Sequence, residues 1–551
     1  MIGVIADPAE REVVCEFFEL FKTPWEFYRQ DGHYDVVLCG GDRRLDTKAK
    51  LTVVYSGHKT QVDDEQKIPL GRLYSQPRIL AYQGDRLPLY GETVTFVGKG
   101  ACLLTIADSS ECGVFRSDLD DRVLARIGYD LFGEIRLLLT AGQPAVNAAI
   151  PALELHIALL KDLITGTGIS VVEIPAVPDG YQFIACLTHD VDHPSIRAHK
   201  WDHTVLGFLY RAVLGSCVEV LRGHMPIQDL LANWVAAVKL PFVFLGFSTD
   251  FWGEFGNQYL QLEAELPSTF FVIPFKDYPG RRADGPAPAF RASRYSAKDI
   301  ADTLQKLITG GREVGLHGLD AWLDSGKGSE ELEEIRRLTG FSEIGVRMHW
   351  LYFASQSPAV LEKAGAAYDS TVGYNETVGY RAGTTQVYRL FDTSQLLELP
   401  MHAMDTALFY LSYLGLSPRK VSVRLRQMAD IAVQYGGCFT INWHDRSLAP
   451  ERLWGGCYRD LIDDLRSRGA WFSTAGQAVS WFRKRRSATF EIASSGSGAV
   501  RVKLAVLHPD NLPGLKLRTH KAQKPSAFGT RRSEEYVDVA VEQIYNKSVP
   551  S

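Results

Sequence analysis

Apolar runs of strand length alternate with stretches of helical spacing in the first third of the chain. Runs at 2–6 and 36–39 enclose an amphipathic segment whose apolar residues recur at near-helical spacing: Val13, Val14, Phe17, Phe18 and Leu20. This order of strand, helix and strand predicts the start of a small α/β domain. We add strands at 51–55 and 93–97 and helices at about 119–138 and 144–165. The domain is predicted to span 1–178, ending at a proline-bearing connector.

The middle of the chain, 181–482, repeats strand-length apolar runs between helical stretches. The runs lie at 183–187, 268–274, 313–316, 345–348, 396–399, 438–443 and 470–473. Alternating strands and helices predict a mostly parallel sheet or barrel with helices outside it. In such folds, functional sites lie at the C-terminal ends of the strands.

A helical insertion at about 195–265 interrupts this rhythm. It contains two apolar stretches, 205–221 and 230–247, that are broken by Arg211, Glu219 and Lys239. Helices packed on the barrel are one interpretation, and a membrane-surface patch or a partner-binding lid is the other. Because no run of about 18 uninterrupted apolar residues occurs, we expect no transmembrane helix.

The last segment, 487–551, shows short alternating runs at 488–492, 499–507, 515–518 and 536–541, which predict a small antiparallel β module. Charge is unevenly distributed: residues 483–551 contain 13 Lys and Arg but 6 Asp and Glu, although the whole chain has a net charge of −5. This near-balance argues against a globally basic nucleic-acid-binding protein, and we expect no nucleic-acid partner.

Cysteine usage and the first residues bear on the compartment. Eight cysteines in 551 residues, with no CxxC pair, are too sparse for a disulfide scaffold. The N-terminus lacks a basic region, and acidic Asp7 and Glu10 interrupt its apolar residues, so we expect no signal peptide. We therefore predict a cytoplasmic protein with reduced cysteines. Peripheral contact with the inner membrane surface is compatible with this location.

Two carboxylates, Asp190 and Asp192, follow a predicted buried strand. In a D-x-D pair one carboxylate can bind a divalent metal while the other takes a proton from water, and a cation removes the repulsion between them. Acidic turns of this kind are common in proteins and often have no function. The pair therefore indicates a site only together with other candidate ligands nearby.

Three histidines occupy similar positions, each at or just after the end of a separate predicted strand: His317, His349 and His444. Packing alone explains one such histidine but not a set of three beside a D-x-D pair. An Asp/His/His set suits Zn²⁺ with an open position for water. His189 and His193 flank the acidic pair and are expected outside the metal shell.

The ordered series of motifs resembles the polysaccharide deacetylase superfamily, carbohydrate esterase family 4. The resemblance covers 183–475 and rests on the segments 188–192 (THDVD), 268–273 (STFFVI), 313–317 (EVGLH), 345–350 (GVRMHW), 397–400 (LELP) and 441–444 (INWH). It implies an irregular (β/α) barrel of about seven strands and the metal-dependent removal of N- or O-acetyl groups from glycans. We therefore expect a carbon–nitrogen hydrolase acting on an N-acetylated sugar.

The resemblance also implies roles for single residues. Asp190 is the general base, Asp192 and His317 are metal ligands, Arg347 orients the base, and His444 is the general acid on the leaving amine. One ligand departs from the family pattern, because the second histidine of an H-x-x-x-H pair is replaced by Ala321.

His349 is our proposed replacement for that missing ligand. Residues two apart on a strand share a face, so Arg347 and His349 can both point at the site. This R-x-H arrangement is similar to a divergent branch of the superfamily associated with surface-polysaccharide loci.

The substrate is expected to be a glycan, or a sugar carried on a lipid or a nucleotide. Four residues are predicted to contact it: Tyr374, Arg381, Trp350 and Trp443. Tyr and Arg suit stacking on sugars and binding of anionic groups. His402 and Asp405 follow the fifth strand as further candidates for the cleft.

Two other functions remain open from sequence. Ala321 fits a barrel that lost catalysis and now binds a glycan or scaffolds a biosynthetic complex. The D-x-D pair fits hydrolysis of a ureide or cyclic imide on the same fold.

Overall fold

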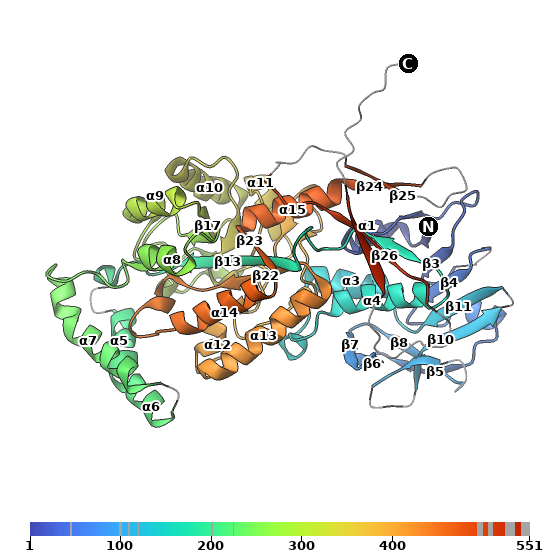
Figure 1. The fold of residues 1–551 in the computed structure, drawn as a ribbon, viewed down its shortest axis with the longest axis horizontal. Coiled ribbons are helices and arrows are strands. Elements are labelled where there is room, and N and C mark those ends of the chain that lie inside the picture. Colours follow the sequence, from blue (N-terminus) through green and yellow to red (C-terminus); the bar gives the residue numbers. More distant parts are fainter. Residues whose placement is uncertain are drawn as a thin grey trace, which may run out of the picture. The chain divides into compact units, whose positions relative to one another are not determined.

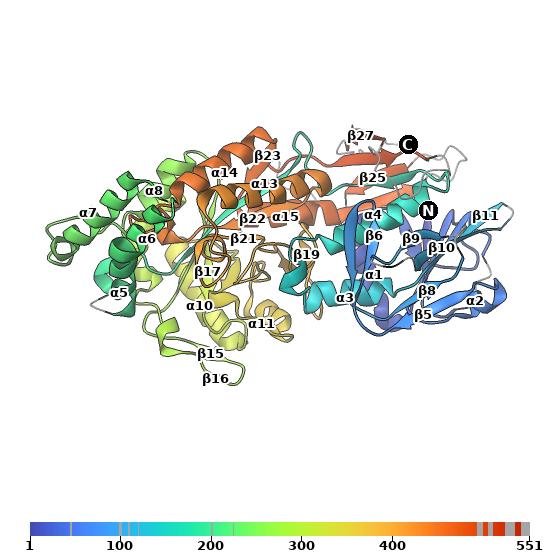
Figure 2. The same ribbon diagram turned by 90° about the horizontal axis from the view of Figure 1, so that it is seen from below.

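The computed structural model describes residues 1–43, 47–98, 102–107, 109, 111–119, 121–199, 202–223, 225–492, 500–504, 511–523 and 535–541. The chain divides into two compact units (Figures 1 and 2). The first contains Met1–Gly180, Ala382–Thr384 and Trp481–Ser551, and the second contains Tyr181–Arg381 and Thr385–Ser480.

The first unit is built on a mixed sheet. In the described residues this sheet has nine strands in the order β2-β1-β3-β4-β11-β10-β8-β5, with β9 paired to β10. Its strands are β1 (Ile2–Ile5), β2 (Trp25–Phe27), β3 (Val36–Gly40), β4 (Leu51–Tyr55), β5 (Leu70–Tyr74), β8 (Thr93–Phe96), β9 (Cys102–Thr105), β10 (Cys112–Leu119) and β11 (Arg122–Ile127). β6 (Arg78–Tyr82) and β7 (Asp85–Leu89) form a separate hairpin. The predicted strand–helix–strand start is present, because β1 and β3 pair in parallel.

Four α-helices belong to this unit: α1 (Arg11–Phe21), α2 (Gln61–Glu65), α3 (Leu131–Thr140) and α4 (Ala152–Thr165). The helix expected at about 119–138 is wrong in its first half, where β11 lies between β4 and β10. Leu124, Ala125 and Ile127 are all buried in this central strand. Burial on both faces removes the alternation that identifies a strand in sequence.

The strands near the C-terminus cluster with the first unit. β12 (Val171–Glu173) pairs with β26 (Lys516–His520), which pairs with β27 (Tyr536–Ala540). β24 (Ala488–Ile492) and β25 (Val500–Leu504) form a hairpin. Both β26–β27 and β24–β25 are antiparallel, as expected. Parts of the predicted C-terminal module lie outside the described residues, namely 493–499, 505–510, 524–534 and 542–551.

A curved parallel sheet organises the second unit and confirms the predicted β/α barrel-like fold. Its strand order is β18-β17-β14-β13-β22-β21, with β23 also paired to β13, and every one of these pairings is parallel. The strands are β13 (Phe183–Val191), β14 (Thr269–Val272), β17 (Glu313–Gly318), β18 (Val346–Met348), β21 (Ala403–Met404), β22 (Cys438–Asn442) and β23 (Ala470–Ser473). The run at 396–399 is not in this path: β20 (Leu397–Glu398) pairs antiparallel with β19 (Tyr388–Arg389), and β21 lies beside β22.

Helices surround this sheet (Figures 1 and 2). They are α8 (Phe255–Glu263), α9 (Ala301–Thr309), α10 (Ser325–Thr339), α11 (Ser357–Ala364), α12 (Asp405–Phe409), α13 (Pro418–Tyr435) and α14 (Gly455–Ser467), with α15 (Ala475–Ser487) after the last strand. A small ribbon, β15 (Arg281–Arg282) and β16 (Gly285–Pro286), lies between β14 and α9 in the chain. Alternation of parallel strands with outer helices brings the strand ends to one edge.

The insertion folds as a helical hairpin at one end of this unit, made by α5 (His203–Leu209), a π-helical segment (Tyr210–Gly215), α6 (Ser216–Leu221) and α7 (Ile227–Phe244) (Figures 1 and 2). By length and composition, two of the described helices are long and apolar enough to cross a membrane: His203–Leu221, with mean hydropathy 1.5, and Ile227–Phe244, with 1.3. The charged residues that interrupt these stretches do not lower the mean hydropathy enough to fail this test, and the absence of a transmembrane helix stays a prediction.

Candidate metal centre and active site

The polar residues of the motifs meet at the C-terminal edge of the parallel sheet. Asp190 ends the buried strand β13, with Asp192 just beyond it. His317 lies on β17 opposite Arg347 on the neighbouring strand β18. His349 directly follows β18, and His444 lies two residues after the end of β22. Residues separated by up to 254 positions therefore share one edge, as the alternating pattern predicts.

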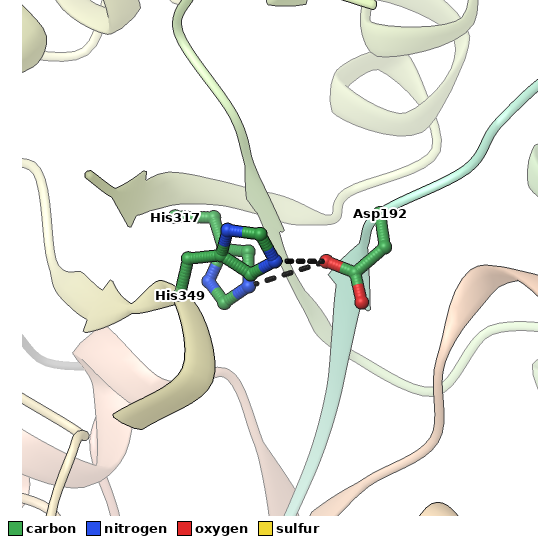
Figure 3. Close-up of side chains that lie close together, drawn as sticks. All are labelled: Asp192, His317 and His349. Carbon is green, nitrogen blue, oxygen red and sulfur yellow. Dashed lines mark ion pairs between the residues drawn. The ribbon is translucent and has the colours of Figure 1, made fainter. Parts of the chain in front are cut away.

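Asp192, His317 and His349 form a cluster that could hold a metal ion. His317 Nε2 lies 3.4 Å and His349 Nε2 3.6 Å from the same oxygen, Asp192 Oδ1. Figure 3 shows both imidazole rings directed at this carboxylate from two different strand ends. One nitrogen or oxygen from each residue lies within 4.8 Å of the others, which is the arrangement needed to bind one ion.

The backbone fixes the tautomer of His317. Its Nδ1 lies 3.0 Å from the carbonyl oxygen of Arg347 and donates a proton to it. The lone pair of a neutral imidazole then sits on Nε2 and faces the Asp192 carboxylate. Two lone pairs facing each other repel unless a cation lies between them, and a backbone bond to the second nitrogen is typical of metal-bound histidines.

Three further observations show that the cluster fits a divalent metal. Asp192 Oδ1 is buried and has no hydrogen-bond partner. Burial alone would raise the pKa of Asp192, but the surrounding His317, His349 and His444 lower it well below its ordinary value, so the carboxyl is ionised. Burial lowers the pKa of His349 well below its ordinary value, which keeps that imidazole neutral. Metal binding requires these protonation states.

Asp190 is held beside the cluster by two donors. Arg347 Nη1 donates to Asp190 Oδ1 at 3.0 Å, and Asn442 Nδ2 donates to Oδ2 at 2.7 Å. Arg347 binds Asp190 through Nη1 and not as a bidentate pair, because its Nε and Nη2 donate to Ser370. The second donor, Asn442, was missed in the sequence analysis, although it lies within the closing motif. Asp190 Oδ2 is 3.9 Å from His317 Nε2, so the carboxylate reaches the edge of the cluster.

His444 lies across the cluster from the histidine ligands. Its Nε2 is 3.8 Å from Asp192 Oδ2, and its Nδ1 is 2.6 Å from Asp405 Oδ1. Burial disfavours the charged imidazole, but the Asp405 carboxylate outweighs it and raises the pKa of His444 to about 10. The backbone N–H of His444 and the Ser447 hydroxyl also donate to Asp405. Asp405 thus supports His444, whereas the sequence suggested only a place in the cleft.

Position 321 lies in the packed interior and not at the cluster. Ala321 is fully buried, and its Cα and Cβ are among the atoms that a Cβ added at Gly328 would meet at 3.2 and 3.3 Å. An imidazole has no room there. His349, and not residue 321, is the third member of the cluster.

A cavity of about 480 Å³ opens above the cluster. Both aspartates and all three histidines line it, together with Phe290, Trp350, Asn375, Tyr410, Tyr413, Arg446 and Arg452. Of the four predicted substrate contacts, Trp350 alone lies in this lining. Trp443 is fully buried and stacks on Tyr458 at 5.2 Å, and Arg381 donates to the carbonyl of Gly373. Tyr374 is also buried outside the lining.

The two histidines that flank the aspartates lie outside the cluster, as predicted. His189 is buried and bonded to Glu263 Oε1 at 2.8 Å and to the carbonyl of Trp443. His193 reaches the cavity but its Nδ1 faces His199 Nε2 at 3.2 Å. The backbone turns sharply beside the third ligand, because Trp350 and Leu351 both have positive φ, 64° and 53°. Such strain in non-glycine residues is typical of functional sites.

Comparison with family models gave no match, and comparison with curated proteins gave none either. Among solved structures, the chain is similar to a protein from Mycobacterium smegmatis provisionally assigned as a polysaccharide deacetylase, with 18% identity over 56% of this chain and 94% of the other, and a TM-score of 0.35. It is also similar to the allantoinase Puue, with 14% identity over 55% and 91% and a TM-score of 0.34.

A third similar structure is a pseudoenzyme of carbohydrate esterase family 4 from Bacillus anthracis, with 11% identity over 41% of this chain and 60% of the other, and a TM-score of 0.24. At these identities the likeness concerns the fold and does not discriminate between an active and an inactive protein. The parallel β/α sheet of the second unit, with the motif residues along its C-terminal edge, is consistent with the (β/α) barrel that the resemblance to the polysaccharide deacetylase superfamily implied.

Proposed function

We propose that this protein is a metal-dependent hydrolase that removes the acetyl group from an N-acetylated sugar of a glycan or of a glycan precursor. One observation carries the proposal: a three-residue metal-binding cluster, a supported carboxylate and a supported imidazole all line the same cavity. Hydrolysis of an acetamide needs these three elements, because water must be activated and the amine must leave protonated.

Asp192, His317 and His349 are the residues that would hold the metal. A divalent ion bound there supplies Lewis acidity, polarising the acetamide carbonyl and lowering the pKa of a water molecule. The mixed nitrogen and oxygen donor set suits Zn²⁺. Zinc as the metal and the cytoplasm as the location stay predictions from the sequence.

Asp190 is the proposed general base. Arg347 and Asn442 each bind one of its oxygens, which holds the carboxylate beside the cluster. It takes a proton from the attacking water, whose oxygen adds to the carbonyl carbon of the acetamide. A fixed base of this kind contributes roughly 10²–10⁴-fold to the rate.

His444 is the proposed general acid. The Asp405 carboxylate keeps its imidazole protonated at neutral pH. It gives this proton to the sugar nitrogen as the carbon–nitrogen bond breaks, so the products are acetate and a free amino sugar. His444 thus holds the proton that the leaving amine needs, and Asp190 is placed to accept one from water.

Metal content and acetate release from the purified full chain test this function. We expect stoichiometric divalent metal, loss of metal in Asp192→Ala and His349→Gln, and retained metal in His193→Gln. The last is the matched control, because His193 lines the same cavity but is not part of the cluster. Acetate release from acetamido sugars should disappear with the metal.

Three outcomes would contradict the proposal in different ways. A wild-type chain without stoichiometric metal excludes a metal-dependent hydrolase. Bound metal without turnover of any acetamido sugar favours the glycan-binding or scaffold alternative. Turnover of a ureide or cyclic imide in place of an acetamide identifies the third function.

A further inference from the structure

Two buried arginines line the active-site cavity beside the metal cluster, and a third approaches them from the helical hairpin. Arg446 and Arg452 are 7% and 5% exposed and belong to the cavity lining. Arg446 lies 4.5 Å over the ring of Trp252, and Arg452 lies 4.9 Å over Trp454. Arg211 comes from the π-helical segment of the hairpin. Aromatic rings, which carry no charge, therefore pack against the guanidinium groups of Arg446 and Arg452.

Several of their nitrogens have no protein partner. Nη1 of Arg446, Nε and Nη1 of Arg452, and Nε of Arg211 are buried without a hydrogen bond. Arg452 Nη2 donates to the Tyr410 hydroxyl at 2.5 Å. In the part of the chain that the structure describes, no carboxylate forms an ion pair with any of the three. Glu451 and Asp445 act on Arg446 and Arg452 from a distance without forming an ion pair. Buried guanidinium nitrogens without a direct partner are costly, so they leave donors for an anionic ligand.

The electrostatics around the three arginines are mixed. Burial lowers the pKa of Arg452, but Tyr410, Asp405 and Glu451 outweigh it and raise that pKa. Burial and the neighbouring Arg452 and Arg446 lower the pKa of Arg211 to about 10. Burial would raise the pKa of Tyr410, but the three arginines outweigh it and lower that pKa. Guanidinium donors from several directions match a tetrahedral phosphate better than a planar carboxylate, which one guanidinium can satisfy.

The hairpin that supplies Arg211 presents a large apolar surface to solvent. Its inner face packs through Val205, Phe208 and Val243. On its outer face, large side chains are between 38% and 88% exposed: Leu206, Tyr210, Val213, Leu214, Val218, Leu221, Ile227, Leu231, Trp234, Val235, Val238 and Phe242. Only 28% and 22% of the apolar windows in its two helices are buried. Exposed apolar surface on this scale marks an interaction site.

A lipid bilayer is the occupant that fits both features. Its phosphate groups lie next to its apolar layer, just as the arginines lie next to the apolar hairpin. Both helices have the apolar composition of membrane-inserting segments, whereas an ordinary protein interface is only about as apolar as the rest of a surface.

We propose that Arg211, Arg446 and Arg452 bind the phosphate of a lipid-linked N-acetylated sugar, which the α5–α7 hairpin reaches at a membrane surface. The inference rests on the proposed function for the reaction on the sugar. The phosphate is bound and not cleaved, so it orients the acetamide toward the metal cluster.

Calorimetric titration of the full chain with inorganic phosphate tests the arginine subsite without relying on turnover. Arg452→Gln should weaken binding by about tenfold or more, because it removes charge-assisted hydrogen bonds to the anion. The matched control is Arg282→Gln, since Arg282 is 49% exposed and pairs with Asp284 on the surface. Acetate as titrant should bind much more weakly than phosphate. Equal binding by Arg452→Gln and wild type would overturn the subsite.

Vesicle sedimentation tests the source of the phosphate. Wild type should sediment with phosphatidylcholine vesicles that contain phosphatidic acid, and Leu214→Asp/Val235→Asp should stay in the supernatant. Leu73→Asp is the control, because Leu73 is 57% exposed but lies on β5 in the first unit. Phosphate binding without sedimentation would overturn the lipid source. Phosphate and vesicle binding without acetate release from any substrate would instead overturn the proposed reaction and leave the subsite standing.

Discussion

Asp405 sets the protonation of His444. The imidazole is buried, which favours its neutral form, yet the carboxylate at 2.6 Å raises its pKa to about 10. In turn, His444 helps to keep the pKa of Asp405 below its ordinary value despite burial. The pair therefore stores a proton next to the cavity across the neutral range.

Asp405→Asn should lower the pKa of His444, because the anion that favours the charged imidazole is removed. The acid is then deprotonated at a lower pH, so the alkaline limb of the kcat profile should move to lower pH. At pH 8 we expect kcat to fall by roughly 10²-fold. Metal content measured in parallel should be unchanged. A profile that keeps its alkaline limb would assign the proton to another group.

Ala321→His tests whether the family's usual ligand position can be restored. The side chain at 321 is fully buried and packs against Gly328, so an imidazole overfills the interior. We expect a loss of about 2 kcal/mol in the free energy of unfolding, measured by urea denaturation, and no gain in bound metal. Higher metal occupancy in this variant would show that the backbone can bring residue 321 to the cluster.

The sequence indicated the aspartates and histidines of the candidate site but not the residues that support them. Aspartate and histidine stand out at strand ends, whereas Asn442 looks like any polar residue until its contact with Asp190 is seen. Trp443 illustrates a second limit. Successive strand residues point to opposite faces, so the residue after Asn442 turns into the core, where Trp443 packs on Tyr458. Whether Asn442 or Trp443 points at the site depends on the register of the strand, which the sequence alone does not provide.

At the scale of elements, a buried ion pair joins two strands of the first unit. Glu173 on β12 and His520 on β26 lie 2.8 Å apart. Burial raises the pKa of Glu173, but Lys161 and His520 outweigh this and lower it to about 2. The folded carboxyl therefore holds its proton less tightly than the unfolded one.

This shift predicts the acid sensitivity of the first unit. Between pH 4.5 and pH 2 the unfolded chain binds more protons, so the stabilisation is complete above pH 4.5 and is lost as the pH falls toward 2. Glu173→Gln should cost about 3 kcal/mol at pH 7 and less than about half of that at pH 3. Urea denaturation at the two pH values measures the difference. An equal cost at both would assign the effect to packing.

Helices and strands were predicted best where only one of their faces is buried. α1 has one apolar face, and its helical spacing was visible in the sequence. β11 is buried on both faces and was mistaken for part of a helix. β21 has two residues and no sequence pattern of its own. Its place beside β22 is decided by tertiary packing, which periodicity does not record.

At the scale of the whole molecule, the proposed metal should raise the free energy of unfolding when it binds the Asp192, His317 and His349 cluster. An ion that binds only the folded chain adds about 2.7 kcal/mol when free metal is about 100 times Kd. A chelator should therefore lower the melting temperature of wild type, followed by circular dichroism. Asp192→Ala should melt at the same temperature with and without chelator. A wild type indifferent to chelation would mean that no ion stabilises the fold.

The division into units was only partly accessible from the sequence. The boundary near residue 180 follows a proline-bearing connector, and the compact units also separate at that point. Local pattern does not reveal that Ala382–Thr384 and Trp481–Ser551 cluster with the first unit. Pairing of β12 with β26 joins residues almost 350 positions apart, and such pairings leave no local trace.

β18 presents three separate contributions within four residues. The carbonyl of Arg347 fixes His317, the guanidinium of Arg347 holds Asp190, and His349 completes the cluster. Because side chains alternate along a strand, loss of one residue just before β18 would turn all of these groups away together. A point substitution removes one of these contributions at a time. A single deletion in the preceding loop would remove all three together and abolish the proposed activity. Among descendants of this chain, deletions there would mark the inactive lineages.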